Sequence, residues 1–182
     1  MRHIKIIRSI SLIIVTFLIT SCSNNSAMKP EDFKNKEPRL IIEEYLTGNV
    51  KAWGVLQNRS GKVTRQFSAD LDGTWDGKQL ILKEKFNWDD GEVQNRKWII
   101  NKIDENNYEG TAGDVVGKAK GYSYGPAFKF EYVLLVPVKG REMKITFDDW
   151  IFKQDERVAI NRATMTKFGI KVAELTVVFI KD

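Results

Sequence analysis

The chain has 182 residues, of which 42% are hydrophobic and 11% aromatic, so it can form one folded domain and is not a disordered protein. Its formal net charge of +5 does not indicate a nucleic-acid-binding protein. Residues 1–21 hold three of the 29 basic residues and no acidic residue, which leaves 26 basic and 24 acidic residues in the remainder. A remainder this close to neutral lacks the basic surface that nucleic acids require, and we expect no nucleic-acid partner.

Histidine and cysteine each occur once, as His3 and Cys22. If the leading segment is removed before Cys22, the folded domain has neither an imidazole nor a core thiol. Nucleophile arrangements of the Ser-His-Asp or Cys-His type are then excluded, as are disulfides and zinc sites built on His or Cys. We expect no metal and no cofactor.

The first 21 residues have the pattern of a bacterial secretory signal. Three basic residues precede an apolar run from Ile10 to Ile19, which is shorter than the roughly 20 apolar residues of a membrane-spanning helix. The stretch from Leu18 to Cys22 resembles the lipobox of bacterial lipoproteins. That resemblance implies cleavage before Cys22, diacylglycerol on its sulfur and acylation, for example by palmitate, of its new amino group. The alternative is an ordinary signal peptide with an incidental cysteine.

Ser23 follows Cys22 where an aspartate could stand, which in proteobacterial lipoproteins resembles the pattern of export to the outer membrane. We therefore expect a protein that is anchored in the outer membrane by acyl chains and faces the periplasm. Residues 22–36 are mostly polar, which predicts a lipidated flexible tether. Residues 37–182 then form the folded domain.

A short helix is predicted between Pro38 and Gly48, because proline near the first turn and glycine just past the last are usual at helix ends. Two apolar pairs stand four positions apart in it, Ile41 with Tyr45 and Ile42 with Leu46. We expect this helix to close one end of a barrel. A helix lying on a membrane surface is the alternative, which its two acidic residues and single basic residue disfavour.

The rest of the chain alternates between extended segments and turn signals such as Asp-Gly and Ser-Gly. Strands are expected at residues 50–57, 62–71, 78–88, 92–103, 108–117, 128–136, 141–153, 157–168 and 170–180. Short connections make neighbouring strands antiparallel, and closure removes two unpaired sheet edges. The prediction is an all-β, antiparallel, up-and-down barrel of about eight to ten strands with one short N-terminal helix, and a two-sheet sandwich is the alternative.

Glycines are dense between residues 110 and 125, which raises the question of a phosphate-binding loop. The spacing matches neither GxxxxGK[ST] nor GxGxxG. We interpret the segment as a kinked or bulged strand, because glycine lets a sheet coil strongly.

Five stretches together are similar to a known family: residues 48–54, 73–77, 108–117, 147–150 and 161–163. They resemble a family of proteobacterial lipoproteins that contain a domain of unknown function with a lipocalin-like (calycin) barrel. The resemblance runs from about Pro38 to Phe179. It implies a lipocalin-like fold and supplies no catalytic residues. By analogy with lipocalins in general it implies an apolar ligand inside the barrel, although Trp53 lies five positions after Gly48 and the usual Gly-x-Trp is absent.

Asp148, Asp149 and Trp150 lie in the middle of one predicted strand, where neighbouring side chains face opposite sides. One carboxylate must therefore face the interior, but both faces carry apolar residues and the sequence does not decide which. A buried carboxylate needs a partner, and Arg162 on the next strand could bridge to it. Alternatively, Arg162 lies in the cavity and binds the carboxylate or phosphate headgroup of a lipid.

Five tryptophans belong mostly to the core, and some of them could line a cavity for an apolar molecule. The predicted ligand-binding residues are Trp53, Trp75, Trp98, Asp149, Trp150 and Arg162. Arg65 and Arg96 are further candidates for binding a headgroup.

Three functions follow from these patterns. We expect a monomeric, non-enzymatic envelope lipoprotein whose partners are the membrane and a lipid-like ligand inside the barrel. The first alternative is a structural lipoprotein with a side-chain-filled barrel whose outer surface contacts another envelope protein. The second is a carboxylate-based hydrolase. Adjacent Asp148 and Asp149 diverge and cannot be its acid pair, whereas Asp70 with Asp114 or Asp149 stays open.

Overall fold

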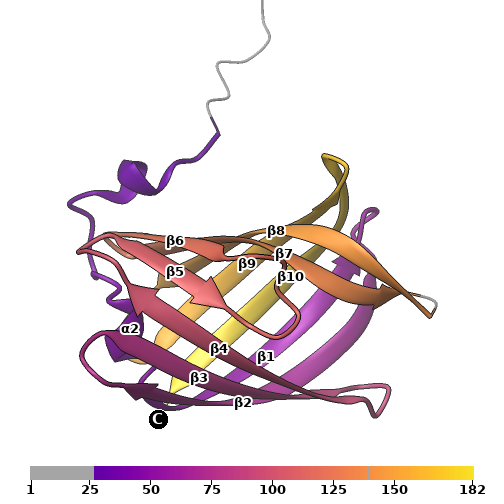
Figure 1. The fold of residues 1–182 in the computed structure, drawn as a ribbon, viewed down its shortest axis with the longest axis horizontal. Helices are drawn as coiled ribbons and strands as arrows, with labels where there is room; N and C mark the ends of the chain where they lie inside the picture. The colour runs from indigo at the N-terminus through magenta and orange to yellow at the C-terminus, as the bar shows by residue number, and fades with distance from the viewer. Residues whose placement is uncertain (1–26, 139) are drawn as a thin grey trace, which may run out of the picture.

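A computed structural model of the protein describes residues 27–138 and 140–182 and forms one closed antiparallel barrel (Figure 1). Each strand pairs with the next in chain order, and the last strand pairs with the first. Ten strands are present in the described residues: β1 (Gly48–Asn58), β2 (Val63–Trp75), β3 (Gln79–Trp88), β4 (Val93–Lys102), β5 (Asn107–Thr111), β6 (Ala119–Tyr124), β7 (Ala127–Val138), β8 (Arg141–Lys153), β9 (Val158–Lys167) and β10 (Ile170–Lys181). The predicted all-β, up-and-down barrel is confirmed. The predicted signal segment, Cys22 and the first part of the predicted tether lie outside the described residues.

The glycine-rich segment differs from the single kinked strand predicted for residues 108–117. It forms two short strands, β5 and β6, joined by a loop in which Gly117 adopts a positive φ of 75°. The loop bonds to β7, since the Leu135 amide donates to the Asp114 carbonyl and the Val116 amide donates to the Val133 carbonyl. These main-chain bonds fix Asp114 beside the barrel wall, which matters for the site described below.

Alternate residues of each strand face the interior, as a half-buried sheet requires. On β3, for example, Leu80 and Leu82 are buried while Lys83 is exposed. Aromatic rings form a continuous interior row whose neighbouring centroids lie 5.0–5.5 Å apart, made of Phe128, Phe130, Trp98, Tyr132 and Phe147. This row gives the barrel a rigid inner wall.

The predicted helix is much shorter than residues 38–48. Only α2 (Ile42–Tyr45) is helical, and it lies at one end of the barrel (Figure 1). The residues before it are held by the barrel instead, because the Leu40 amide donates to the Gly125 carbonyl and the Ser123 hydroxyl donates to the Leu40 carbonyl. Leu40 and Ile42 are fully buried, so this end is packed shut.

Part of the predicted tether rests on the outside of the barrel. Residues 30–33 form a 3-10 turn, η1 (Pro30–Phe33), and the ring of Phe33 lies 6.0 Å from that of Trp150 and 5.4 Å from that of Phe152. The first strand is therefore preceded by a covering segment. None of the helices in the described part of the chain combines the length and hydropathy that crossing a bilayer requires.

Candidate ligand-binding cavity

The barrel encloses a cavity of about 280 Å³, close to the lower limit of about 300 Å³ for small-molecule sites. Ile42 and Leu46 line it at the end closed by α2. At the other end its lining includes Arg65 and Glu92, whose side chains are 28% and 51% exposed, so the cavity reaches solvent there. Most of the wall between these ends is apolar.

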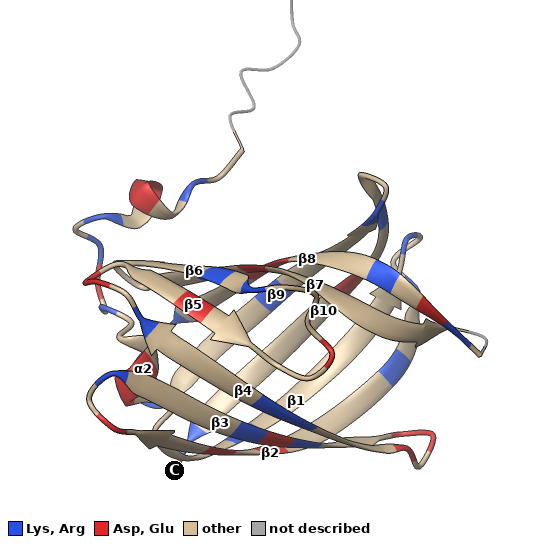
Figure 2. Ribbon diagram, viewed as in Figure 1, with Lys and Arg blue, Asp and Glu red and all other residues tan. Residues whose placement is uncertain are grey.

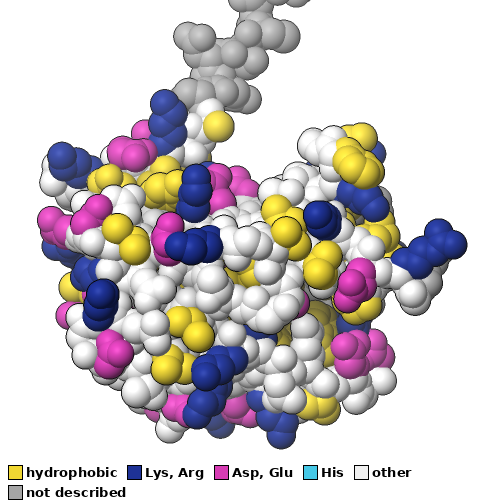
Figure 3. Space-filling model, in the orientation of Figure 1, with side chains coloured by type: hydrophobic (Ala, Val, Ile, Leu, Met, Phe, Trp, Pro, Cys, Tyr) yellow, Lys and Arg dark blue, Asp and Glu magenta, His cyan; other side chains and the backbone are white. Residues whose placement is uncertain are grey.

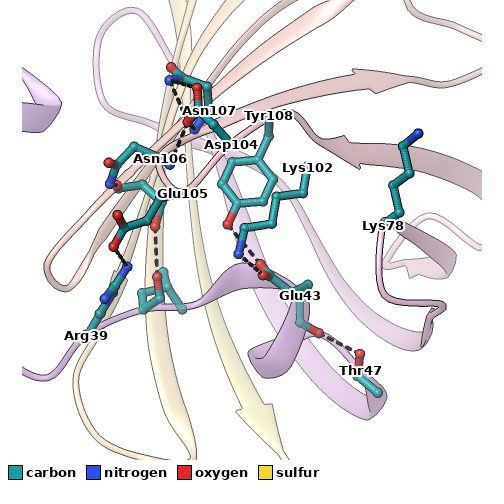
Figure 4. A network of polar contacts seen from close by, with 12 residues as sticks. Arg39, Glu43, Thr47, Lys78, Lys102, Asp104, Glu105, Asn106, Asn107 and Tyr108 are labelled. Carbon is teal, nitrogen blue, oxygen red and sulfur yellow. Dashed lines mark hydrogen bonds and ion pairs between the residues drawn. The ribbon is translucent and has the colours of Figure 1, made fainter.

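The closed end is fastened by a buried carboxylate (Figure 4). Glu43 of α2 is 4% exposed, forms an ion pair with Lys102 of β4 and accepts a 2.9 Å hydrogen bond from the hydroxyl of Tyr108 on β5. Burial alone would raise the pKa of Glu43, but the bonds from Lys102 and Tyr108 outweigh it and lower this pKa. The carboxylate therefore stays ionised and holds α2 against two strands.

A polar cluster interrupts the apolar wall at the middle of the barrel. Glu84 of β3 stands directly opposite Arg96 of β4, with 3.8 Å between Oε2 and Nη1. Arg96 gives its hydrogen bonds elsewhere: Nε and Nη2 donate to Oδ2 of Asp114 at 3.0 and 2.8 Å. Among the described residues, the buried Oε2 of Glu84 and Oδ1 of Asp114 have no hydrogen-bond partner.

Burial determines the protonation of this cluster. It raises the pKa of Glu84 to about 7, against the opposing effect of the Arg96 charge. Burial also raises the pKa of Asp149, which accepts hydrogen bonds from the Tyr132 hydroxyl at 2.8 Å and from the Asn161 amide. Two of the interior acids thus lie in surroundings that favour the neutral form.

The mouth of the cavity carries a second arginine. Arg65 of β2 lies 4.0 Å over the ring of Trp88 and donates to Asp90 and Glu92 at 2.8 Å each. The two acids belong to the turn between β3 and β4, whose acidic tip is red in Figure 2. Arg65 breaks the apolar face of its strand because it lies at the opening, where its charge is balanced.

Two of the residues predicted to bind a ligand, Trp98 and Asp149, line the cavity. Asp149 is thus the inward-facing member of the Asp148-Asp149 pair. Trp75 is half-buried and packs against the core. Trp53 is 48% exposed on the outer face of β1 and does not reach the interior.

Trp150 and Arg162 correct the sequence-based prediction, because both point away from the cavity. The register pairs Trp150 with Arg162 on the outer face, one residue out of phase with Asp149. Trp150 is buried there beneath Phe33 rather than by the barrel interior. The side chain of Arg162 is 68% exposed and lies 3.6 Å from Glu174. Asp149 therefore has Asn161 and Tyr132 as partners, not the expected arginine.

Three residues of the polar cluster were not predicted: Glu84, Tyr132 and Asn161. Glu84 had a visible signal, since it occupies the apolar register of Leu80, Leu82 and Phe86 in β3. Asp114 was named only as an open member of an acid pair, and its place beside Arg96 depends on the loop between β5 and β6. Asp70, the suggested partner of an acid pair, is exposed on the outside of β2. Within residues 27–138 and 140–182, no three His, Cys, Asp or Glu side chains are grouped to hold a metal ion.

Two solved structures share this fold. The S-type phycobiliprotein lyase CPES from Guillardia theta superposes with a TM-score of 0.57 and 11% identity, over 77% of this chain and 90% of that one. A protein of unknown function from the DUF3598 family of Nostoc punctiforme PCC 73102 gives a TM-score of 0.58 and 12% identity, over 81% of this chain and 51% of that one. This chain thus spans about half of the latter protein. At such identities the likeness shows the fold, a lipocalin-like barrel, and not a function.

Comparison with curated proteins gave no match. The model of a family described as a protein of unknown function, DUF3833, matches residues 16–181, nearly the whole chain. This match confirms the predicted resemblance to a family with a domain of unknown function and a lipocalin-like barrel. The chain belongs to the DUF3833 family.

Proposed function

We propose that this protein is a non-enzymatic binding protein that holds an amphiphilic, lipid-like ligand inside its barrel. The cavity of about 280 Å³, apolar for most of its wall and polar at mid-depth, carries this proposal. Apolar walls accept a hydrocarbon portion, and a few fixed polar groups orient it. A barrel filled by side chains, as in the structural alternative, would leave no such space.

A cavity-filling substitution tests the proposal. Val177 of β10 is buried and lines the cavity, whereas its neighbour Val178 is 37% exposed on the outer face. We expect Val177→Phe to weaken binding of the neutral fluorophore N-phenyl-1-naphthylamine at least tenfold, and Val178→Phe to change it less than twofold. Both are made in a Cys22→Ser chain expressed without residues 1–21, which lacks the predicted acylation site and the apolar leading segment. Absence of binding by the unsubstituted chain, or equal loss in both variants, would contradict an interior site.

We further propose that the protein works as a monomer at a membrane, anchored through acyl chains on Cys22 in the outer membrane and facing the periplasm. The lipobox-like stretch before Cys22 supports the anchor. The tip of the β9–β10 hairpin supports a membrane contact, since Phe168 is 92% and Ile170 54% exposed, with Lys167 and Lys171 beside them. Figure 3 shows hydrophobic side chains at this tip, which lies at the end of the barrel away from α2. A bilayer touching it would lie near the cavity mouth.

The anchor has its own test. Cells that express the protein in the presence of radiolabelled palmitate should yield a labelled chain in the membrane fraction, and Cys22→Ser should remove the label. Recovery of an unlabelled protein that still carries its first 21 residues would overturn the anchor.

A further inference from the structure

The wall of the cavity carries more acid than base. Among the described residues that line it, the charged side chains are Arg65, Arg96, Glu84, Glu92, Asp114 and Asp149. The two arginines thus face four acids within one enclosed space. The cavity carries a net negative charge only when Glu84 or Asp149 is ionised, and a bound cation would favour that ionised state.

The arginines are already engaged. At the mouth, Arg65 is bonded to Asp90 and Glu92. At mid-depth, Arg96 directs both of its hydrogen bonds to Asp114. Each guanidinium is therefore already held by a carboxylate, and its charge is balanced within the protein.

The atoms left without a hydrogen-bond partner at mid-depth are acceptors. Oε2 of Glu84 and Oδ1 of Asp114 are buried and unbonded among the described residues, and both side chains line the cavity. The unbonded buried donors that line it, Nε of Arg65 and Nε1 of Trp88, belong to the pair stacked at the mouth. A buried acceptor without a donor is unfavourable, so the inner site lacks a group that donates hydrogen bonds.

We propose that the cavity takes an amphiphile whose buried polar group is a protonated amine, bound by Glu84 and Asp114. An ammonium supplies three donors and a positive charge that favours the ionised form of both carboxylates. A carboxylate or phosphate at the same place would stand against Glu84, Asp114 and Asp149 and would leave both acceptors unsatisfied. This inference rests on the proposed function and specifies the class of ligand.

Three probes of one chain length test this inference: dodecylamine, dodecanol and dodecanoate. Each is used below its micellar concentration, and its affinity is measured by displacement of N-phenyl-1-naphthylamine from the Cys22→Ser chain. We expect dodecylamine to bind at least tenfold more tightly than dodecanol, and dodecanoate to bind most weakly. Glu84→Gln should reduce the advantage of the amine at least tenfold while the affinity for dodecanol changes less than twofold.

Glu174→Gln is the matched control, because Glu174 is a half-buried carboxylate paired with Lys171 on the outer face of the barrel. It should retain the full preference for the amine. If circular dichroism shows that Glu84→Gln does not fold, Asp114→Asn provides the same comparison.

The outcomes separate the inference from the proposed function. Equal affinities for the three probes, or tightest binding of dodecanoate, would overturn the preference for an amine while leaving an amphiphile-binding barrel in place. Failure of every probe, the fluorophore included, would overturn both.

Discussion

Glu84 is a carboxylate whose burial lowers the stability of the fold but places a hydrogen-bond acceptor in the cavity. It faces the interior between Leu82 and Phe86, and the arginine opposite it gives its hydrogen bonds to Asp114. The result is a buried carboxylate with a pKa raised to about 7. Strongly shifted carboxylates of this kind are common at functional sites, where local stability is given up for chemistry or binding.

The stability of the protein should record this cost as a dependence on pH. The pKa of Glu84 rises from 4.5 to about 7 on folding, so the folded state binds the extra proton and loses stability as the pH rises through this window. Glu84→Gln imitates the neutral form. We expect it to raise the free energy of unfolding by about 3 kcal/mol at pH 8 and by less than about 1 kcal/mol at pH 5, as measured by urea denaturation. If Glu84→Gln is less stable than the parent at pH 8, then interactions within the protein stabilise the ionised form of Glu84, which would contradict the raised pKa.

The limits of the sequence are clearest at single residues. The two-residue period placed Asp149 on the same face as Ile145 and Phe147, but Trp150 looked equally able to face inward. The reason is η1, which covers Trp150 from outside and makes both faces of β8 apolar. The partner of Asp149 depends on the β8–β9 register, which a strand pattern does not contain, and this register places Arg162 outside.

Among the elements, α2 decides which end of the barrel is closed. It has only four residues, too few for a stable helix alone, so contacts with the strands must hold it. Glu43 provides one fastening, and the hydroxyl of Tyr45 provides another by donating to the carbonyl of Arg157 at 2.9 Å. The sequence indicated a helix here from its ends and apolar pairs. Its real length was not predictable, because Leu40 bonds to Gly125, a contact between distant parts of the chain.

The close packing of α2 against β2 depends on the absence of a side chain at Gly73. A Cβ there would lie 1.8 Å from the carbonyl oxygen of Leu46, which ends the helix. We expect Gly73→Ala to lower the free energy of unfolding by roughly 2–3 kcal/mol, because backbone at both positions would have to move. Thermal unfolding monitored by circular dichroism measures this change.

Gly113 offers the control for this substitution. It lies in the loop between β5 and β6, and a Cβ added to it would meet nothing within 4 Å. Gly113→Ala should therefore unfold at nearly the temperature of the parent. If the two alanine variants behave alike, the close approach of α2 to β2 does not contribute to stability.

At the scale of the whole molecule, the sequence was a reliable guide to architecture. Nine predicted segments are separated by turn signals, and a closed antiparallel barrel is the simplest way to pair every strand. The structure adds a tenth strand where glycine-rich residues turn into a loop. The size of the cavity could not be predicted from the sequence, since it depends on how side chains from β3, β4, β7 and β8 pack across the interior.

The central claim is that this interior is occupied by a ligand in the working protein. Native mass spectrometry of the protein purified from the cells that make it tests this claim most directly. We predict a population heavier than the chain and its covalent acyl groups, with an excess mass that collisional activation removes and that Val177→Phe abolishes. A spectrum that contains only the covalent mass, in the unsubstituted protein and in Val177→Phe alike, would contradict a ligand-holding barrel.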